Sequence, residues 1–339
     1  MDVVKFQPMN EFSFTPNPDS TVLKFQQLVD AVIDAINRKA LQEGDALPSV
    51  NQLIKESSMS RDTVFKAYAE LKKRGIVEAI PNKGYFVASN QQRVFLFLDT
   101  FKAYKEVLYS SFKESLPEDI VVDVNFHHYN INVFESIIQN SVGKYNTYIV
   151  MNFDHPDVSR IIKKIPADRL LVIDWKINAG SEHSRVYQDF GDSVTQCLEE
   201  GQHLLQKYEE IVCVYPEYTY HPYDSVEAIE RFCREKGLRF SVVKEVKKLE
   251  MTVGRAYLVF EDIDLGSLLK QVRSKKFQLG RDIGILSYND TPMKEFVMGG
   301  ITVISTDFVK MGEAAAGFVT GDEKLDRVIP THLVIRESL

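Results

Sequence analysis

The segment Ser60-Arg61-Asp62-Thr63 carries side chains suited to reading nucleic acid. An arginine can donate two hydrogen bonds to a guanine base, and a lysine such as Lys66 neutralises phosphate. Lys83-Gly84 offers a related chemistry, because the lysine can bind phosphate and the glycine, which lacks Cβ, lets the chain approach a DNA backbone closely. These residue types predict a nucleic-acid-binding surface within the first ninety residues.

A second set of polar and aromatic side chains follows apolar runs farther along the chain. Thr100 and Tyr104 come just after the run 94–98, and Trp175, the only tryptophan, follows the run that ends before Asp174. A tryptophan ring can stack on the C–H face of a sugar, although a place in a core or a lobe interface would explain it equally well. We take these three residues as candidates for binding a small molecule.

Helices and a hairpin must position the candidate nucleic-acid-binding residues. Apolar residues recur every three or four positions over 22–36, which predicts an amphipathic helix. Ser49 and Ser60 are placed to cap two further helices. The β-rich runs 76–80 and 85–87 predict a hairpin with a proline- and glycine-containing turn. This is the layout of a winged helix, whose third helix can lie in the major groove of DNA.

The charge is unevenly distributed along the chain. Between residues 20 and 90, ten Lys and Arg stand against eight Asp and Glu, so this segment carries +2 and the remainder −9 of the overall −7. Such asymmetry indicates that the two parts have different partners. On spacing alone, a generic three-helix domain with a solvated basic face remains the alternative.

Five short motifs in this segment resemble the DNA-binding domain of GntR-family transcription regulators. In order they are Leu47-Pro48-Ser49, Ser60-Arg61-Asp62-Thr63-Val64, Ala67-Tyr68-Ala69-Glu70-Leu71, Gly75-Ile76 and Asn82-Lys83-Gly84-Tyr85-Phe86-Val87. With the spacing, the resemblance implies operator contacts from Ser49, Asn51, Ser60, Arg61, Thr63, Lys66, Lys83 and Gly84. Asn51 and Phe65 stand where many members have arginine, so we expect the operator sequence to depart from family norms.

Residues 93–339 alternate apolar runs with helical stretches, which predicts βαβ units and parallel sheet. The apolar runs are 94–98, 120–124, 147–151, 170–173, 211–214, 240–243, 257–260 and 283–286. About 245 residues suit two doubly wound lobes better than one sheet, with a ligand at the carboxyl ends of the strands. The predicted fold class is α/β: a winged helix-turn-helix at 1–89 and a two-lobed parallel-sheet domain at 93–339.

The end of the chain resembles the LacI/GalR-type regulatory domain, which has the periplasmic-binding-protein fold. The similarity rests on 280–292, Gly300-Ile301-Thr302-Val303-Ile304 and Arg336-Glu337-Ser338, and in mid-domain on Val186-Tyr187-Gln188-Asp189-Phe190. It implies a sensor for a sugar or another small metabolite that dimerises through this domain.

The same resemblance adds three candidate ligand-binding residues. Asn289 occupies a strand end where the family usually has aspartate, and its alternative role is to form a turn. Asp189 matches a family acid near the cleft, and its alternative role is a helix N-cap. His221 lies near a ligand-binding arginine of the family, and its alternative is a solvated loop histidine. We expect a neutral polyhydroxylated effector, because no cluster of Arg or Lys suited to phosphate accompanies these residues.

Motifs of other function classes are missing from the sequence. It has no G-x-x-x-x-G-K-[ST], G-x-G-x-x-G, H-E-x-x-H or G-x-S-x-G pattern. The three cysteines form no C-x-x-C pair, His127 and His128 would point to opposite faces of a strand, and no apolar run reaches eighteen residues. We therefore expect no catalytic residue, metal, cofactor or membrane contact.

The sequence predicts a cytoplasmic, homodimeric transcription regulator of carbohydrate-utilisation genes. We expect it to bind a pseudo-palindromic operator and a small-molecule effector, for which a sugar is the favoured class. The alternative is a metabolite-binding, enzyme-like domain, such as a transferase or hydrolase, fused to a DNA-binding module.

Overall fold

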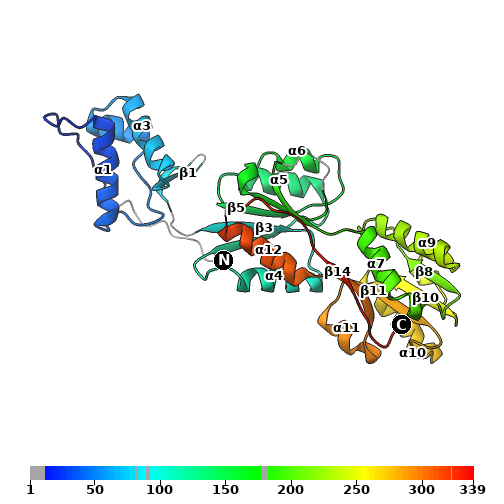
Figure 1. Cartoon of the computed structure of the whole chain (residues 1–339). Coiled ribbons are helices and arrows are strands. Elements are labelled where there is room, and N and C mark those ends of the chain that lie inside the picture. The colour runs from blue at the N-terminus through cyan, green and yellow to red at the C-terminus, as the bar shows by residue number, and fades with distance from the viewer. Residues whose placement is uncertain (1–11, 81–82, 89–91, 177–181, 322) are drawn as a thin grey trace. The chain divides into compact units, whose positions relative to one another are not determined.

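A computed structural model describes residues 12–80, 83–88, 92–176, 182–321 and 323–339 (Figure 1). The chain divides into two compact units, one up to Gln92 and one from Arg93 to Leu339. Among the helices in the described ranges, none has both the length and the apolar character needed to cross a bilayer.

The first unit consists of three helices and a hairpin. Helices α1 (Lys24–Asn37), α2 (Val50–Ser57) and α3 (Arg61–Lys73) precede the antiparallel strands β1 (Val77–Ile80) and β2 (Gly84–Val87). The Ser49 and Ser60 side chains cap α2 and α3. Each hydroxyl oxygen accepts a hydrogen bond from the backbone N–H three residues later, Gln52 and Thr63 respectively. Apolar residues of all three helices and both strands share one core. This confirms the predicted winged helix.

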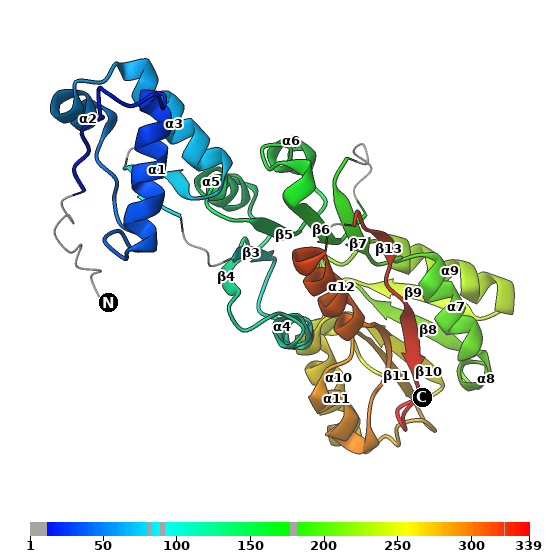
Figure 2. The same ribbon diagram turned by 60° about the vertical axis from the view of Figure 1, so that its left-hand side comes forward.

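The first lobe of the larger unit is a fully parallel, six-stranded sheet in the order β13-β7-β6-β5-β3-β4. Its strands are β3 (Arg93–Leu98), β4 (Val121–Phe126), β5 (Thr147–Met151), β6 (Leu170–Asp174), β7 (Ser184–Tyr187) and β13 (Asp326–Val328). One face is covered by α4 (Ala103–Glu114) and α12 (Phe308–Thr320), and the other by α5 (Ile131–Ser141) and α6 (Val158–Ile162) (Figure 2). The short helix η1 (Ala167–Arg169) precedes β6.

Burial on both faces explains the apolar runs in this lobe. Along β3, Val94 and Leu96 pack toward α4 and α12, whereas Phe95 and Phe97 pack toward α5 and α6. The two helices on the first face approach closely at Gly312, where a Cβ would lie 2.6 Å from a carbonyl oxygen of α4.

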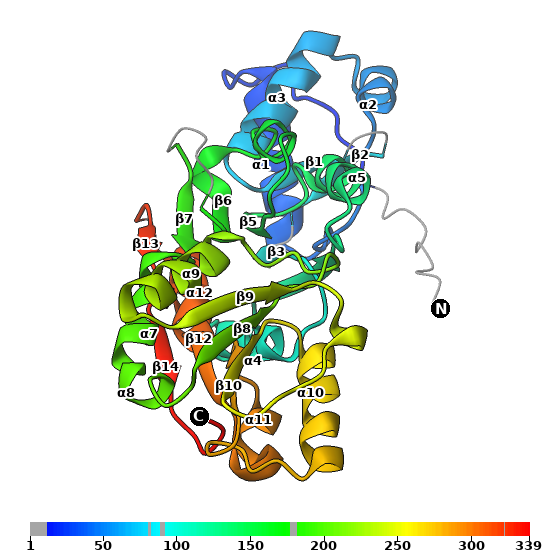
Figure 3. The same ribbon diagram turned by 90° about the vertical axis from the view of Figure 1, so that its right-hand side faces the viewer.

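The second lobe is another six-stranded sheet, in the order β14-β12-β11-β10-β8-β9, in which only β14 is antiparallel. Its strands are β8 (Glu210–Val214), β9 (Arg239–Val243), β10 (Arg255–Val259), β11 (Gly284–Tyr288), β12 (Thr302–Thr306) and β14 (Thr331–Val334). Helices α7 (Asp192–Glu200) and α9 (Asp224–Lys236) cover one face and α10 (Asp262–Lys275) covers the other (Figure 3). The shorter helices are α8 (Gln202–Leu205), α11 (Pro292–Phe296), η2 (Val246–Lys248) and η3 (Val297–Gly299).

The chain passes between the lobes three times: after β7, after β12, and between β13 and β14. These segments bind one another, because Asp307 N donates to Pro330 O at 3.0 Å and Ile329 N donates to Tyr187 O at 2.8 Å. Three short connections side by side form a hinge about which two rigid lobes can turn.

The fold class agrees with the prediction, two parallel-sheet lobes after a winged helix. The predicted strands omit β7, β12, β13 and β14. Of these, β7, β13 and β14 have only three or four residues each, whereas β12 has five. In β13 all three residues are exposed, so no apolar run marks it.

Candidate ligand cavity and nucleic-acid interface

A small cavity of about 30 Å³ lies between the lobes of the larger unit. Its walls come from the segments that follow β3, β4, β6, β7, β8, β10 and β11, so they gather at the carboxyl ends of parallel strands, where such folds bind ligands. The lining residues are Lys102, Tyr104, Tyr129, Asp174, Trp175, Gln188, Phe190, Tyr220, His221, Pro222, Phe260, Glu261 and Asn289.

Four of the six residues expected to bind ligand line this cavity: Tyr104, Trp175, His221 and Asn289. Asp189 is placed elsewhere. Its Oδ1 accepts the backbone N–H groups of Gly191 and Asp192, both at 2.9 Å, in the turn that leads into α7. Thr100 is half-buried and lines a neighbouring hollow of the first lobe beside Phe101.

Asp174 is a cavity residue that we did not choose from the sequence. It ends β6 with a left-handed backbone (φ 82°) and is 5% exposed. Gln188 Nε2 donates to its carboxylate, and Thr306 Oγ1 donates to Gln188 Oε1 at 2.5 Å. Burial raises the pKa of Asp174, and the nearby Lys105 opposes that shift. In the sequence, Asp174 directly follows the apolar run 170–173, and an acid at a strand end was the signal that could have identified it as a cavity residue.

Asn289 presents a buried acceptor at the end of β11. Its backbone is left-handed (φ 58°), and its N–H donates to Ile304 O at 2.8 Å. Lys294 Nζ holds the turn by donating to Asn289 O at 2.7 Å and by pairing with Asp262 at 2.8 Å. No described residue donates to the buried Oδ1 of Asn289.

His221 is a neutral ring set among aromatic residues. It stacks on Phe260 with ring centroids 4.1 Å apart, and burial lowers its pKa well below the usual value. Its Nε2 lies 2.8 Å from Ser225 Oγ. The Ser225 hydroxyl donates its own proton to Phe190 O at 2.9 Å. Nε2 must therefore be the donor to Ser225, which leaves Nδ1 as the acceptor.

Two contacts join the lobes across the cavity. Lys102 Nζ of the first lobe binds both carboxylate oxygens of Glu261 in the second, at 3.0 and 3.1 Å. The rings of Tyr129 and Tyr220 stack with centroids 3.9 Å apart and an interplanar angle of 6°. Both contacts must separate if the lobes part.

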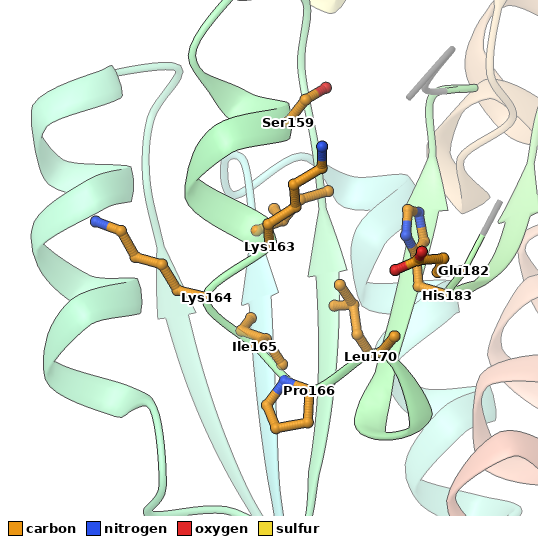
Figure 4. Close-up of a pocket in the computed structure, with 10 residues that line it drawn as sticks. Ser159, Lys163, Lys164, Ile165, Pro166, Leu170, Glu182 and His183 are labelled. Carbon is orange, nitrogen blue, oxygen red and sulfur yellow. The ribbon is translucent and has the colours of Figure 1, made fainter. Parts of the chain in front are cut away.

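A larger hollow of about 560 Å³ lies at the amino ends of β6 and β7, at the edge of the sheet opposite the cavity. Figure 4 shows Lys163 and His183 on its walls, while Lys164 points away toward α5, where its Nζ lies 2.9 Å from Glu135 Oε1. Its position sets it apart from the interlobe site.

The first unit displays the expected DNA-binding residues at its surface. Thr63 is half-buried, and the exposed ones are Ser49, Asn51, Ser60, Arg61, Lys66, Lys83 and Gly84. Four of the eight gather at the start of α3, where Ser60 Oγ and Thr63 Oγ1 lie 2.7 Å apart. Lys83 and Gly84 lie in the hairpin.

Comparisons with known families give one match within each unit. Residues 24–87 match the family described as bacterial regulatory proteins, gntR family. Residues 195–339 match the periplasmic binding protein-like domain.

Two curated relatives from Bacillus subtilis (strain 168) are similar in the first unit. The HTH-type transcriptional regulator YcxD is 34% identical over 64 residues, 19% of this chain and 14% of the relative, so the match spans only a small part of that protein. The HTH-type transcriptional regulator YhcF is 32% identical over 84 residues, which are 25% of this chain and 68% of the relative.

Solved structures are similar to the larger unit. The trehalose repressor from Escherichia coli matches with a TM-score of 0.61 and 13% identity, over 72% of this chain and 100% of that one. A LacI family transcriptional regulator from Lactobacillus casei with bound glucose matches with a TM-score of 0.60 and 15% identity, over 73% and 100% of the two chains. At these identities the likeness concerns the fold.

Proposed function

Because the chain belongs to the gntR family of bacterial regulatory proteins, we propose that it is a DNA-binding transcription regulator whose activity a neutral sugar controls. The winged helix binds the operator, with α3 in the major groove and the hairpin against the backbone. The cavity between the lobes holds the effector. Two chains form a homodimer on a pseudo-palindromic site, because paired half-sites mirror a two-fold protein.

The chemistry of the cavity is the observation that carries the sugar proposal. Asp174 and Asn289 offer buried oxygen acceptors to hydroxyl groups, and Trp175 and Phe260 offer apolar faces to C–H groups. Among the described lining residues Lys102 is the only Lys or Arg, and Glu261 already neutralises it, so phosphate would find no free cation. Structural neighbours include a trehalose repressor and a regulator with bound glucose.

The size of the cavity implies how the effector acts. Pockets for small molecules are typically about 300 Å³ or larger, whereas this one measures about 30 Å³. The lobes must therefore turn about their three connections to admit a sugar. A sugar that favours one lobe arrangement shifts the population of the whole dimer toward it, and so changes how its winged helices meet DNA.

Isothermal titration calorimetry with a panel of pentoses, deoxyhexoses and hexoses tests the proposal. We expect at least one neutral sugar to bind, and Asn289→Ala and Asp174→Asn to lose that binding. Asparagine tolerates the left-handed backbone at 174 and can still accept from Gln188, so the second variant keeps its fold. Asp189→Ala is the matched control, because Asp189 does not line the cavity, and it should bind normally.

Two results would contradict the proposal. If neutral sugars give no heat and a phosphorylated or acidic metabolite binds, the effector class is wrong. If Asn289→Ala and Asp174→Asn both keep full affinity, the cavity is not the binding site.

A further inference from the structure

The ring of Phe65 lies on the outer face of α3 and takes no part in the core of the first unit. Its neighbour Val64 and the residues one turn on, Ala67 and Tyr68, form the buried face of the helix. Phe65 itself is 41% exposed. At about 100° per residue, it lies about 40° around the helix from Arg61 and about 40° from Ala69, which are both exposed.

A cation accompanies this ring. The guanidinium carbon of Arg61 lies 5.5 Å from the centroid of Phe65, which orients the arginine through a cation–π contact. Of the two acids on α3, Glu70 is paired with Arg74 at 2.8 Å, and Asp62 is exposed in the first turn. The middle of the outer face therefore presents an oriented arginine, an aromatic ring and the methyl group of Ala69.

An exposed phenylalanine is by itself ordinary on a protein surface. The position of Phe65 gives its exposure a functional meaning. Phe65 lies beside Arg61 on α3, and on the function proposed above α3 enters the major groove. The apolar group that a base pair displays in that groove is the C5-methyl of thymine, and apolar side chains recognise it by contact.

We propose that Phe65 reads the methyl group of one thymine in each operator half-site. Four residues of helix span about 6 Å and neighbouring base pairs are about 3.4 Å apart. That thymine therefore lies within two base pairs of the base that Arg61 contacts. The operator differs at this position from one read by an arginine, which would select guanine.

The test begins with the full-length chain and random-sequence duplex DNA, from which repeated selection enriches the preferred operator. Each thymine of that operator is then replaced singly by deoxyuridine, which removes only the methyl group. We expect about a fourfold loss of affinity at one thymine per half-site, the amount that burial of one methyl group gives. Phe65→Ala should bind the thymine and deoxyuridine duplexes equally.

Two further variants serve as controls. Phe65→Leu keeps an apolar side chain and should retain most of the methyl dependence. Val22→Ala shortens another exposed apolar side chain of the first unit, 44% exposed and outside α3, and should behave as the wild type. Thermal unfolding of all variants should be nearly unchanged, because the substituted side chains are exposed.

The outcomes separate this inference from the function on which it rests. An operator that is enriched but insensitive to every deoxyuridine substitution overturns the role of Phe65 and leaves DNA binding standing. A methyl dependence that persists in Phe65→Ala assigns the contact to another residue and also overturns it. If selection enriches no sequence, sequence-specific DNA binding and the role of Phe65 fall together.

Discussion

At the scale of single residues, the cavity is built from strand ends with unusual backbone geometry. Tyr129, Asp174 and Asn289 all have a positive φ, at 56°, 82° and 58°. Such conformations persist where their surroundings hold them, and they gather at ligand sites. Here Gln188 binds the Asp174 carboxylate and Lys294 binds the Asn289 carbonyl. The two acceptors proposed for the sugar are therefore fixed before it arrives.

His127 gives a pH dependence that belongs to this scale. It is fully buried next to Met151 O (3.0 Å), and burial lowers its pKa to about 3. An unfolded histidine titrates near 6.5, so between pH 6.5 and 3 the unfolded chain binds one more proton and stability falls as pH falls. The decrease in the free energy of unfolding that is attributable to His127 should reach about 2 kcal/mol near pH 5.

Urea unfolding at about pH 7.5 and about pH 5 measures this loss. His127→Gln, which has no titrating ring, should lose about 2 kcal/mol less between the two conditions than the wild type. An equal loss in both proteins would show that His127 is protonated in the folded state or does not contribute.

At the scale of elements, the predictable parts are those that are buried on both sides. The runs 94–98 and 147–151 became β3 and β5 almost residue for residue, because parallel strands covered by helices carry apolar side chains on both faces. The strands β13 and β14 have no apolar pattern from which they could be predicted. They are positioned by pairing, β13 with β7 and β14 with β12. Asp174 was missed for a similar reason, since Gln188 and Thr306, remote in sequence, complete its surroundings.

The start of α7 gives a prediction at this scale. Asp189 Oδ1 accepts the N–H groups of Gly191 and Asp192 at the entry to the helix. Asp189→Ala leaves these donors without their partner and should destabilise the larger unit by about 1 kcal/mol, as the loss of a helix cap does. Denaturant unfolding measures this cost, and Asp189→Asn should recover most of it. A loss of sugar affinity with no change in stability would instead give Asp189 a role in binding.

At the scale of the whole molecule, the hinge joins the two proposed activities. The lobes meet through Lys102–Glu261 and Tyr129–Tyr220, and they are linked by three short connections. A change of lobe arrangement therefore breaks or makes a few defined contacts. On the proposed function, the effector binds one of two such lobe arrangements more tightly than the other, which coupling to DNA requires.

Reciprocity tests that coupling. If the sugar changes operator affinity, operator DNA must change sugar affinity by the same factor, and couplings of this kind are typically about 1–3 kcal/mol. Calorimetry of the sugar with and without the selected duplex gives one factor, and fluorescence anisotropy of the duplex with and without the sugar gives the other. We expect equal factors of roughly 5- to 150-fold. A sugar that binds with the same affinity whether or not DNA is present would contradict the regulatory link.

The order in which the strands occur along the chain also governs how the protein is made. Helix α12 and strand β13 complete the first lobe, yet a ribosome reaches them only after it has synthesised β8 to β12 of the second. Until then Val94 and Leu96 of the nascent sheet have α4 but lack α12, the second of the two helices that cover their face. A partly uncovered sheet face of this kind favours aggregation and chaperone binding. The lobe that emerges first is thus unable to finish its core until synthesis has passed Ile329, which is buried in that core.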